Sequence, residues 1–353
     1  MPRESSGRGA KKDALRDKDG ASGFRRALGL LGSFRGIAAL IAVFALGVIF
    51  TPKSYTTGWP VFLTLRTQTD ILFEYAEYGI LATGMTLVIL AGGIDLSVGS
   101  VLGFAATFFS LLMIGYGWGP VPAVLVTALA GAAIGAVNGG IIAKFKMQPF
   151  VVTLATMVAA RGLAKWISSG IKVQPGAEPW YQLKSGTPGF FAWMTSPIQH
   201  TGLQPITLLF LINIVAMLLV VRYTRFGRHL YAIGGNEEAA RLSGIQVSWA
   251  KVAAYMLCGL MAALAGISNA TRLELGDPEA GFTYELDAIA AVVIGGTSLM
   301  GGRGGMFFTL VGTLIIGYIN KILSINNVQE AFRLLAKGGI IVAAVLIQQR
   351  KRD

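Results

Sequence analysis

Long apolar runs recur along almost the whole chain, and they constrain the fold more than any other feature. An α-helix needs about 20 apolar residues to cross the ~30 Å hydrocarbon layer of a membrane. Charged residues make up only 14% of the 353 residues, against about 25% in soluble domains. The sequence therefore predicts an all-α, polytopic membrane protein with about ten transmembrane helices. The runs are 36–50, 70–90, 98–116, 120–143, 149–168, 205–221, 251–270, 286–299, 306–323 and 332–347.

Basic residues are concentrated on alternate loops, which predicts the topology. With a cytoplasmic N-terminus, 20 of the 30 Lys and Arg residues lie on the cytoplasmic side. The run at 286–299 is short, but omitting it would place the basic C-terminus outside, so we expect a short or broken helix there. Three regions result: a basic and disordered tail at 1–35, a transmembrane domain at 36–348 and a basic tail at 349–353. Both termini are predicted to be cytoplasmic.

Several kinds of site are not expected. Cys258 is the single cysteine, and His200 and His229 have no second ligand at helical spacing, so we predict no metal site. The net charge of +12 belongs to the cytoplasmic loops, so nucleic acid is not an expected partner. No G-x-x-x-x-G-K-[ST] motif occurs, so the chain is not expected to bind ATP or to be an enzyme.

The loop at 222–250 contains the signals of a short helix from Glu237 to Ser243. Asn236 can cap its start, the acidic residues that follow suit its first turn, and Gly244 suits a left-handed stop. Its small apolar surface either docks in a groove of a partner protein or belongs to an ordinary interfacial helix. The candidate contact residues are Asn236, Glu237, Glu238, Ala239, Ala240, Arg241, Leu242 and Gly244.

Glycine patterns predict two kinds of packing. Gly131, Gly135 and Gly139 lie on one helix face and predict close contact with another helix. The pattern G-G-x-x-L-x-x-G occurs twice, and both copies fall on the cytoplasmic side. Helix breaks at membrane depth often line a transport route, although coincidence is an alternative in a chain with 46 glycines. The candidate route residues in these two motifs are Gly92, Gly93, Gly295 and Gly296, with Asp95 as either a helix cap or a route residue.

Three charged side chains complete the candidate route. Glu74 and Glu77 fall in the outer part of the second span, unless that span is shifted and they lie above the bilayer. Arg161 lies in the fifth span, with Lys165 one turn further on the same face. An unpaired charge in hydrocarbon costs about 3 kcal/mol, so we expect these groups to face a polar interior, where Glu77 and Arg161 could pair.

Three segments carry a family resemblance: ILAGGIDLSVGS, YAIGGNEEAARLSGI and YELDAIAAVVIGGTSLMGGRGG. In this order they resemble the permease subunits of bacterial carbohydrate ABC importers of the ribose, xylose, arabinose and galactose type, from about residue 70 to 348. The basic tail 1–35 and the charged stretch from Arg272 to Glu279 depart from the family pattern.

The resemblance implies a multi-pass protein of the bacterial inner membrane that passes a monosaccharide inward. It implies as partners a cytoplasmic ATPase that binds ATP and Mg, a periplasmic sugar-binding protein, membrane lipid and a second permease, as a homodimer or heterodimer. The outer loops at 169–204 and 271–286 are then expected to meet the binding protein. Two alternatives are an ABC permease for a branched-chain amino acid or nucleoside, and a proton-coupled transporter using Glu74, Glu77 and Arg161.

Overall fold

The computed structural model describes residues 36–55, 58–176, 188–199 and 201–349. The predicted tail at 1–35 and the last four residues lie outside the described residues. Within the described ranges the chain is helical, with two isolated β-bridges, Lys53–Pro60 and Val173–Gly276, and no strand. The predicted all-α class is therefore confirmed.

Six of the described helices are long and apolar enough to cross a membrane. Two further apolar helices are shorter, and two helices in the C-terminal part of the chain coincide with the remaining predicted runs. Helices thus occupy all ten predicted runs, while ten membrane crossings remain a prediction. The six are Val98–Gly115, formed by α4 (Val98–Ser110) and its continuation η2 (Leu111–Gly115), α5 (Pro120–Phe145), α6 (Pro149–Ile167), α8 (Pro205–Tyr223), α11 (Val247–Leu273) and α13 (Met306–Ile325); the others are Gly36–Phe50, α3 (Ala76–Leu90), α12 (Tyr284–Gly295) and α14 (Glu330–Gln349).

Short helices and breaks lie where the chain enters or leaves this bundle. The second predicted span is two helices, α2 (Leu65–Glu74) and α3, which meet at Tyr75. The prediction that 286–299 forms a short helix is confirmed, since α12 has 12 residues. The remaining short elements are η1 (Val61–Leu63), α7 (Gly189–Thr195), α9 (Arg225–Gly235) and α10 (Glu237–Leu242).

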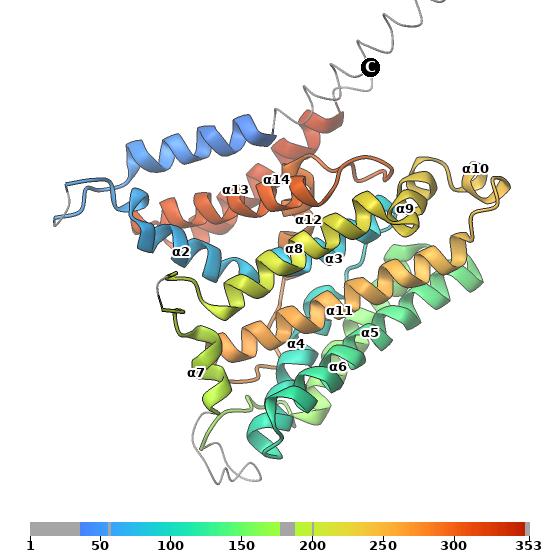
Figure 1. Cartoon of the computed structure of the whole chain (residues 1–353), viewed down its shortest axis with the longest axis horizontal. Helices are drawn as coiled ribbons and strands as arrows, with labels where there is room; N and C mark the ends of the chain where they lie inside the picture. The colour runs from blue at the N-terminus through green and yellow to red at the C-terminus, as the bar shows by residue number, and fades with distance from the viewer. Residues whose placement is uncertain (1–35, 56–57, 177–187, 200, 350–353) are drawn as a thin grey trace, which may run out of the picture.

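Helix α11 is the centre of the fold and packs against α3, α4 and α5 (Figure 1). The predicted contact face of α5 is confirmed, because Gly131, Gly135 and Gly139 are buried against α11. A Cβ atom added to Gly131 would lie 2.6 Å from Gly259 O, so no larger side chain fits at this distance between the backbones.

The bundle has two ends that differ in their short helices. Helices α9 and α10 lie together at one end, at the right of Figure 1. Helices α2 and α7 lie at the opposite end, at the left. We refer to them as the α10 end and the α7 end. The chain reaches the α10 end at the last residues of α3, α8 and α12 and leaves it at the first residues of α11 and α13.

Candidate functional site

Helix α10 has the local structure that its sequence predicts. The Oδ1 atom of Asn236 accepts a hydrogen bond from the backbone N–H of Ala239 at 2.9 Å. The helix runs from Glu237 to Leu242, one residue shorter than predicted, and Gly244 follows with φ of +83°. The cap and the left-handed stop are both confirmed.

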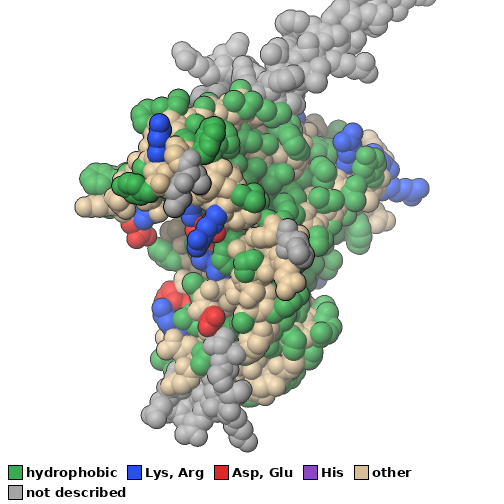
Figure 2. Space-filling model, turned by 60° about the vertical axis from the view of Figure 1, so that its left-hand side comes forward, with side chains coloured by type: hydrophobic (Ala, Val, Ile, Leu, Met, Phe, Trp, Pro, Cys, Tyr) green, Lys and Arg blue, Asp and Glu red, His purple; other side chains and the backbone are tan. Residues whose placement is uncertain are grey.

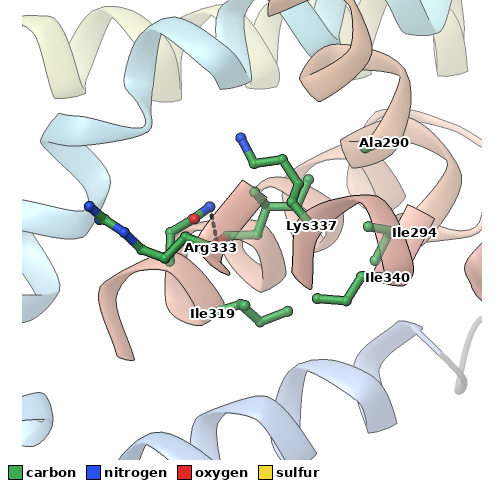
Figure 3. Close-up of a pocket in the computed structure, with 8 residues that line it drawn as sticks. Ala290, Ile294, Ile319, Arg333, Lys337 and Ile340 are labelled. Carbon is green, nitrogen blue, oxygen red and sulfur yellow. Dashed lines mark hydrogen bonds between the residues drawn. The ribbon is translucent and has the colours of Figure 1, made fainter. Parts of the chain in front are cut away.

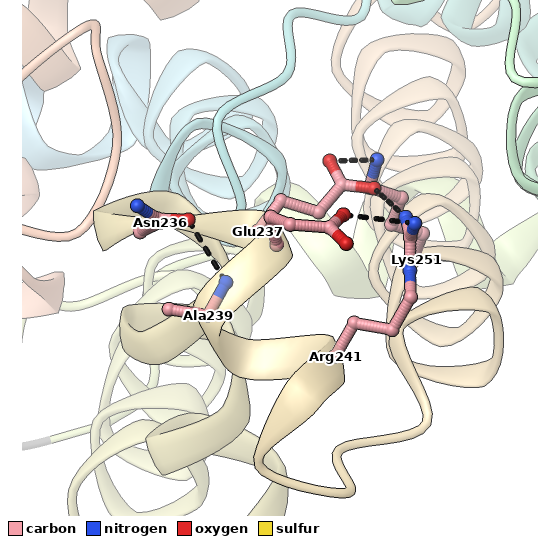
Figure 4. Close-up of polar contacts among 6 residues, drawn as sticks. Asn236, Glu237, Ala239, Arg241 and Lys251 are labelled. Atoms are coloured by element: carbon pink, nitrogen blue, oxygen red, sulfur yellow. Dashed lines mark hydrogen bonds and ion pairs between the residues drawn. The ribbon is translucent and has the colours of Figure 1, made fainter.

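One ion pair holds α10 against the start of α11, and two more lie within α10 (Figure 4). Glu237 lies 2.7 Å from Lys251 of α11, through Oε2 and Nζ, and 3.2 Å from Arg241, through Oε1 and Nη2. Arg241 also contacts Glu238 at 3.0 Å. Lys251 belongs to the central helix of the fold, so a displacement of α10 acts directly on α11.

The apolar surface of α10 differs from the prediction. Ala240, predicted to contribute to a docking surface, is only 5% exposed and belongs to a small core with Ile233, Val247 and Ala250. This burial follows because the chain turns back after Gly244 and brings the start of α11 under α10. Ala239 and Leu242 are exposed, Leu242 at 82%, and they form the outward apolar surface.

A cavity of about 570 Å³ lies beside α10. Its wall includes Glu237 and Arg241 from α10, Lys251 from α11, the turn between α5 and α6 at 146–149, and Gly92. The cavity therefore connects the α10 surface with the first glycine motif.

The two glycine motifs meet at the α10 end. The backbone N–H of Gly302 donates to the carbonyl of Leu90 at 3.1 Å, which joins the end of α3 to the loop between α12 and α13. A Cβ atom on Gly301 would lie 2.9 Å from the Cα of Gly92 and 2.9 Å from the Cα of Gly234. The sequence places both motifs on one side, and the structure brings them into direct contact.

Asp95 is hydrogen-bonded into the turn before α4, and no side chain among the described residues caps the first turn of that helix. Asp95 is 1% exposed, and its Oδ1 atom accepts hydrogen bonds from the backbone N–H of Ser97 at 2.9 Å and from its hydroxyl. Ser97 is the N-cap residue of α4, and Asn138 donates to the Ser97 hydroxyl at 3.1 Å. These contacts fix the turn between the first glycine motif and α4.

Glu77 is the centre of a buried polar cluster at the opposite, α7 end. Its Oε1 atom lies 2.8 Å from Arg272 Nη2 and accepts from the hydroxyl of Tyr284 at 3.2 Å. Its Oε2 atom accepts from Asn269 Nδ2 at 3.0 Å. Tyr284 also stacks on Tyr78, with ring centroids 4.3 Å apart.

The predicted pairing of Glu77 with Arg161 is wrong. The first turn of α3 packs against the last turn of α11, so Arg272 is the nearby cation, whereas α6 packs on α4 and α5. Glu74 also has a partner, Lys321 of α13, at 2.8 Å. Neither carboxylate stands alone, as the cost of an isolated charge in a bilayer requires.

Arg161 of α6 forms hydrogen bonds with the backbone of the segment between α11 and α12. Its Nη1 atom donates to the carbonyls of Pro278 at 2.6 Å and Ala280 at 2.7 Å. Lys165 lies on the same face of α6, as predicted, and pairs with Glu279 at 2.6 Å. Within the segment 271–286, Arg272 and Glu279 are thus engaged in ion pairs inside the chain, and contact of this segment with a binding protein stays a prediction.

Sequence reasoning missed one buried pair. Asp287 of α12 lies 2.8 Å from Lys337 of α14. An acidic residue inside the apolar run 286–299 was the available signal.

Lys337 and Arg333 also border a small cavity between α12, α13 and α14 (Figure 3). With about 10 Å³ this cavity has room for one water molecule, well below the several hundred Å³ of a ligand site.

The surface of the protein combines apolar side chains with charged side chains gathered in limited areas. On the face shown in Figure 2, acidic and basic side chains lie side by side near the middle, and apolar side chains cover much of the surroundings. Many of the exposed large apolar residues belong to α5, α6 and α8, such as Leu129, Val158 and Ile212. This distribution suits helices in contact with lipid.

Long apolar helices, paired charges inside the bundle and broken helices at glycine motifs define an integral membrane protein of the transport type. Residues 68–345 match the family described as branched-chain amino acid transport system / permease component. This match covers more than half of the chain, which therefore belongs to that family.

Known relatives are similar along almost their whole length. The ribose import permease protein of Escherichia coli K12 is 39% identical over 89% of this chain and 94% of its own. The corresponding protein of Bacillus subtilis is 39% identical over 91% and 93%. The xylose transport system permease protein of Escherichia coli K12 is 34% identical over 93% and 97%. No solved structure matches the chain.

Proposed function

We propose that this chain is the membrane permease subunit of an ABC importer that moves a monosaccharide into the cytoplasm. The observation that carries the proposal is the similarity to ribose and xylose permeases over about nine tenths of each chain. It agrees with the resemblance of the three sequence segments to carbohydrate importers. Ribose and xylose are accordingly the first substrates to test.

The partners follow from this assignment. A separate ATPase subunit binds ATP and Mg on the cytoplasmic side and contacts the exposed side of α10, where Ala239 and Leu242 offer a small apolar surface. A sugar-loaded binding protein docks at the α7 end. A second permease subunit, as a homodimer or heterodimer, completes the membrane part in the bacterial inner membrane, with both termini of this chain in the cytoplasm.

The glycine motifs are proposed to line the cytoplasmic part of the sugar route. Gly92, which lies in the first motif, borders the 570 Å³ cavity next to α10. Gly296 ends α12 in the second motif. A neutral sugar suits such a route, because Glu237, Arg241 and Lys251 beside it are paired with one another and do not form a strong site that would retain the substrate.

The two alternatives differ in their support. A branched-chain amino acid substrate agrees with the family description but not with the sugars in the relatives' names. A proton relay through Glu74, Glu77 and Arg161 requires a carboxylate free to exchange its proton. Glu77 instead accepts from three side chains, and Glu74 is paired with Lys321. The structure thus favours energy supply by a partner ATPase.

Uptake by proteoliposomes tests the proposal. Vesicles containing the permease and its ATPase, with binding protein outside and ATP inside, should accumulate labelled ribose or xylose. Accumulation should require ATP and persist when a protonophore removes the proton gradient. Uptake of leucine instead of either sugar, or uptake that needs the proton gradient alone, would overturn the assignment.

Two substitutions test contact between α10 and the ATPase. Ala239→Glu places a charge on the outward surface of α10, and should reduce copurification of the ATPase and sugar uptake together. Gln246→Glu is the matched control, because Gln246 is exposed in the same loop but outside α10. If the two variants behave alike, α10 is not the contact.

A further inference from the structure

Three backbone segments from distant parts of the sequence converge on Gly234 of α9. They are the end of α3 at Leu90, the loop at Gly301–Gly302 and α9 itself. A Cβ atom on Gly234 would overlap the carbonyl oxygen of Leu90 and the backbone nitrogen of Gly302, and would lie 3.0 Å from the carbonyl carbon of Gly301. We call Leu90, Gly92, Gly234, Gly301 and Gly302 the glycine junction.

The glycine junction contains parts of both glycine motifs. Gly92 opens the first motif with φ of +78°, and Gly302 ends the second. The hydrogen bond from Gly302 N–H to the Leu90 carbonyl ties the two breaks together. Gly234 therefore touches the end of α3 and the loop that follows α12, through backbone alone.

The same residue is joined directly to α10. Asn236, the N-cap of α10, follows Gly234 by two positions, and its N–H donates to the carbonyl of Ala232 at 3.1 Å. The end of α9 thus continues into α10 without a loose connection. The 570 Å³ cavity beside α10 also reaches Gly92 and leaves space into which α10 can shift.

We propose that Gly234 is a positioning residue that transmits displacement of α10 to the helix breaks of both glycine motifs. This inference rests on the proposed contact between α10 and the ATPase. When the ATPase moves α10, the end of α9 moves with it, and Gly234 presses on the Leu90 carbonyl and the Gly301–Gly302 backbone at the same time. The two breaks then change together, which opens or closes the cytoplasmic end of the route.

Close backbone contact is what makes this transmission stiff. Side chains can rotate to absorb a shift, whereas backbone atoms in contact displace one another. A methyl group at position 234 would wedge the segments apart because its three nearest neighbours are all backbone atoms. Gly235 is the matched control, since a Cβ atom there meets nothing within 4 Å.

The decisive experiment compares Gly234→Ala with Gly235→Ala in the complete complex with ATPase and binding protein. Assembly, basal ATP hydrolysis, stimulation of hydrolysis by sugar-loaded binding protein, and uptake are measured for each. We expect Gly234→Ala to assemble and keep basal hydrolysis, but to lose stimulation and uptake by about tenfold or more, within the range typical of coupling between sites. Gly235→Ala should match the unsubstituted complex.

Two results would overturn the inference. One is normal stimulation and uptake in Gly234→Ala, and the other is an equal loss in both variants. The unsubstituted complex and Ala239→Glu distinguish this failure from a failure of the proposed function. Suppose that the unsubstituted complex imports sugar, that Ala239→Glu loses ATPase binding, and that Gly234→Ala behaves normally. Then the proposed function stands, and only the transmission through Gly234 is wrong.

A spin label covers the case in which Gly234→Ala does not assemble. Gly235→Cys in a Cys258→Ala background places a nitroxide beside the glycine junction, and Gly140→Cys places one at a second open glycine, on α5. The spectrum at position 235 should change when sugar-loaded binding protein and ATP are added, while that at position 140 should not. An unchanged spectrum at position 235 in an actively transporting complex would overturn the inference.

Discussion

Removing one partner of the ion pair between Glu77 and Arg272 should destabilise the fold far more than removing one partner of a similar pair at the surface. The Glu77 side chain is 2% exposed and that of Arg272 is 26% exposed. Arg272→Met leaves the carboxylate buried with only Asn269 and Tyr284 as donors. Removing one partner of a buried pair costs about 3–5 kcal/mol, because the other charge stays buried. This corresponds to roughly a 100- to 4,000-fold change in the folding equilibrium.

The pair between Lys165 and Glu279 provides the matched control. Its partners are 50% and 56% exposed, although its distance of 2.6 Å is shorter than that of the buried pair. Exposed pairs contribute at most about 1 kcal/mol, so Lys165→Met should have a small effect. The burial of each pair, and not its distance, therefore determines which of the two variants should lose more stability.

The assay is unfolding of the purified permease in mixed micelles by a denaturing detergent, followed by circular dichroism. Adding Glu77→Gln to Arg272→Met should recover part of the loss, because it removes the buried charge that caused it. Equal destabilisation by Arg272→Met and Lys165→Met, or no recovery in the double variant, would refute the reasoning.

Three further predictions concern the termini, α10 and α6. A reporter fused after Asp353 should be cytoplasmic, and activity on the outer face would contradict the topology. Asn236→Ala removes the 2.9 Å cap of α10, which should cost about 1 kcal/mol and lower ATPase affinity in a binding titration; unchanged affinity would remove the cap from the contact. Arg161→Ala deprives the carbonyls of Pro278 and Ala280 of their donor and should impair uptake or assembly, whereas wild-type levels of both would exclude Arg161 from the site.

Local structure at α10 could be read from the sequence because its determinants are neighbours. Asn236 caps α10 by accepting a hydrogen bond from Ala239, three residues further on, and Gly244 follows the end of the helix by two residues. The orientation of Ala240 could not be read in this way. It depends on Val247 and Ala250, which reach it only after the chain has turned back into α11.

The partners of the buried charges lie beyond the reach of sequence patterns. Arg272 and Tyr284 are 195 and 207 positions away from Glu77. Apolar periodicity shows that Glu77 needs a partner but gives no information on which helix supplies it. The same holds for the two glycine motifs. The sequence shows both motifs, but their contact through Gly234 depends on how α3, α9 and α12 are placed in the fold.

The shortness of α12 has a consequence for membrane insertion during synthesis. Its 12 residues span about 18 Å, so α12 alone cannot cross a hydrocarbon layer of about 30 Å. Asp287 near its start needs Lys337, which is synthesised 50 residues later. We therefore expect α12 to take its final position in the lipid only after α14 has been synthesised.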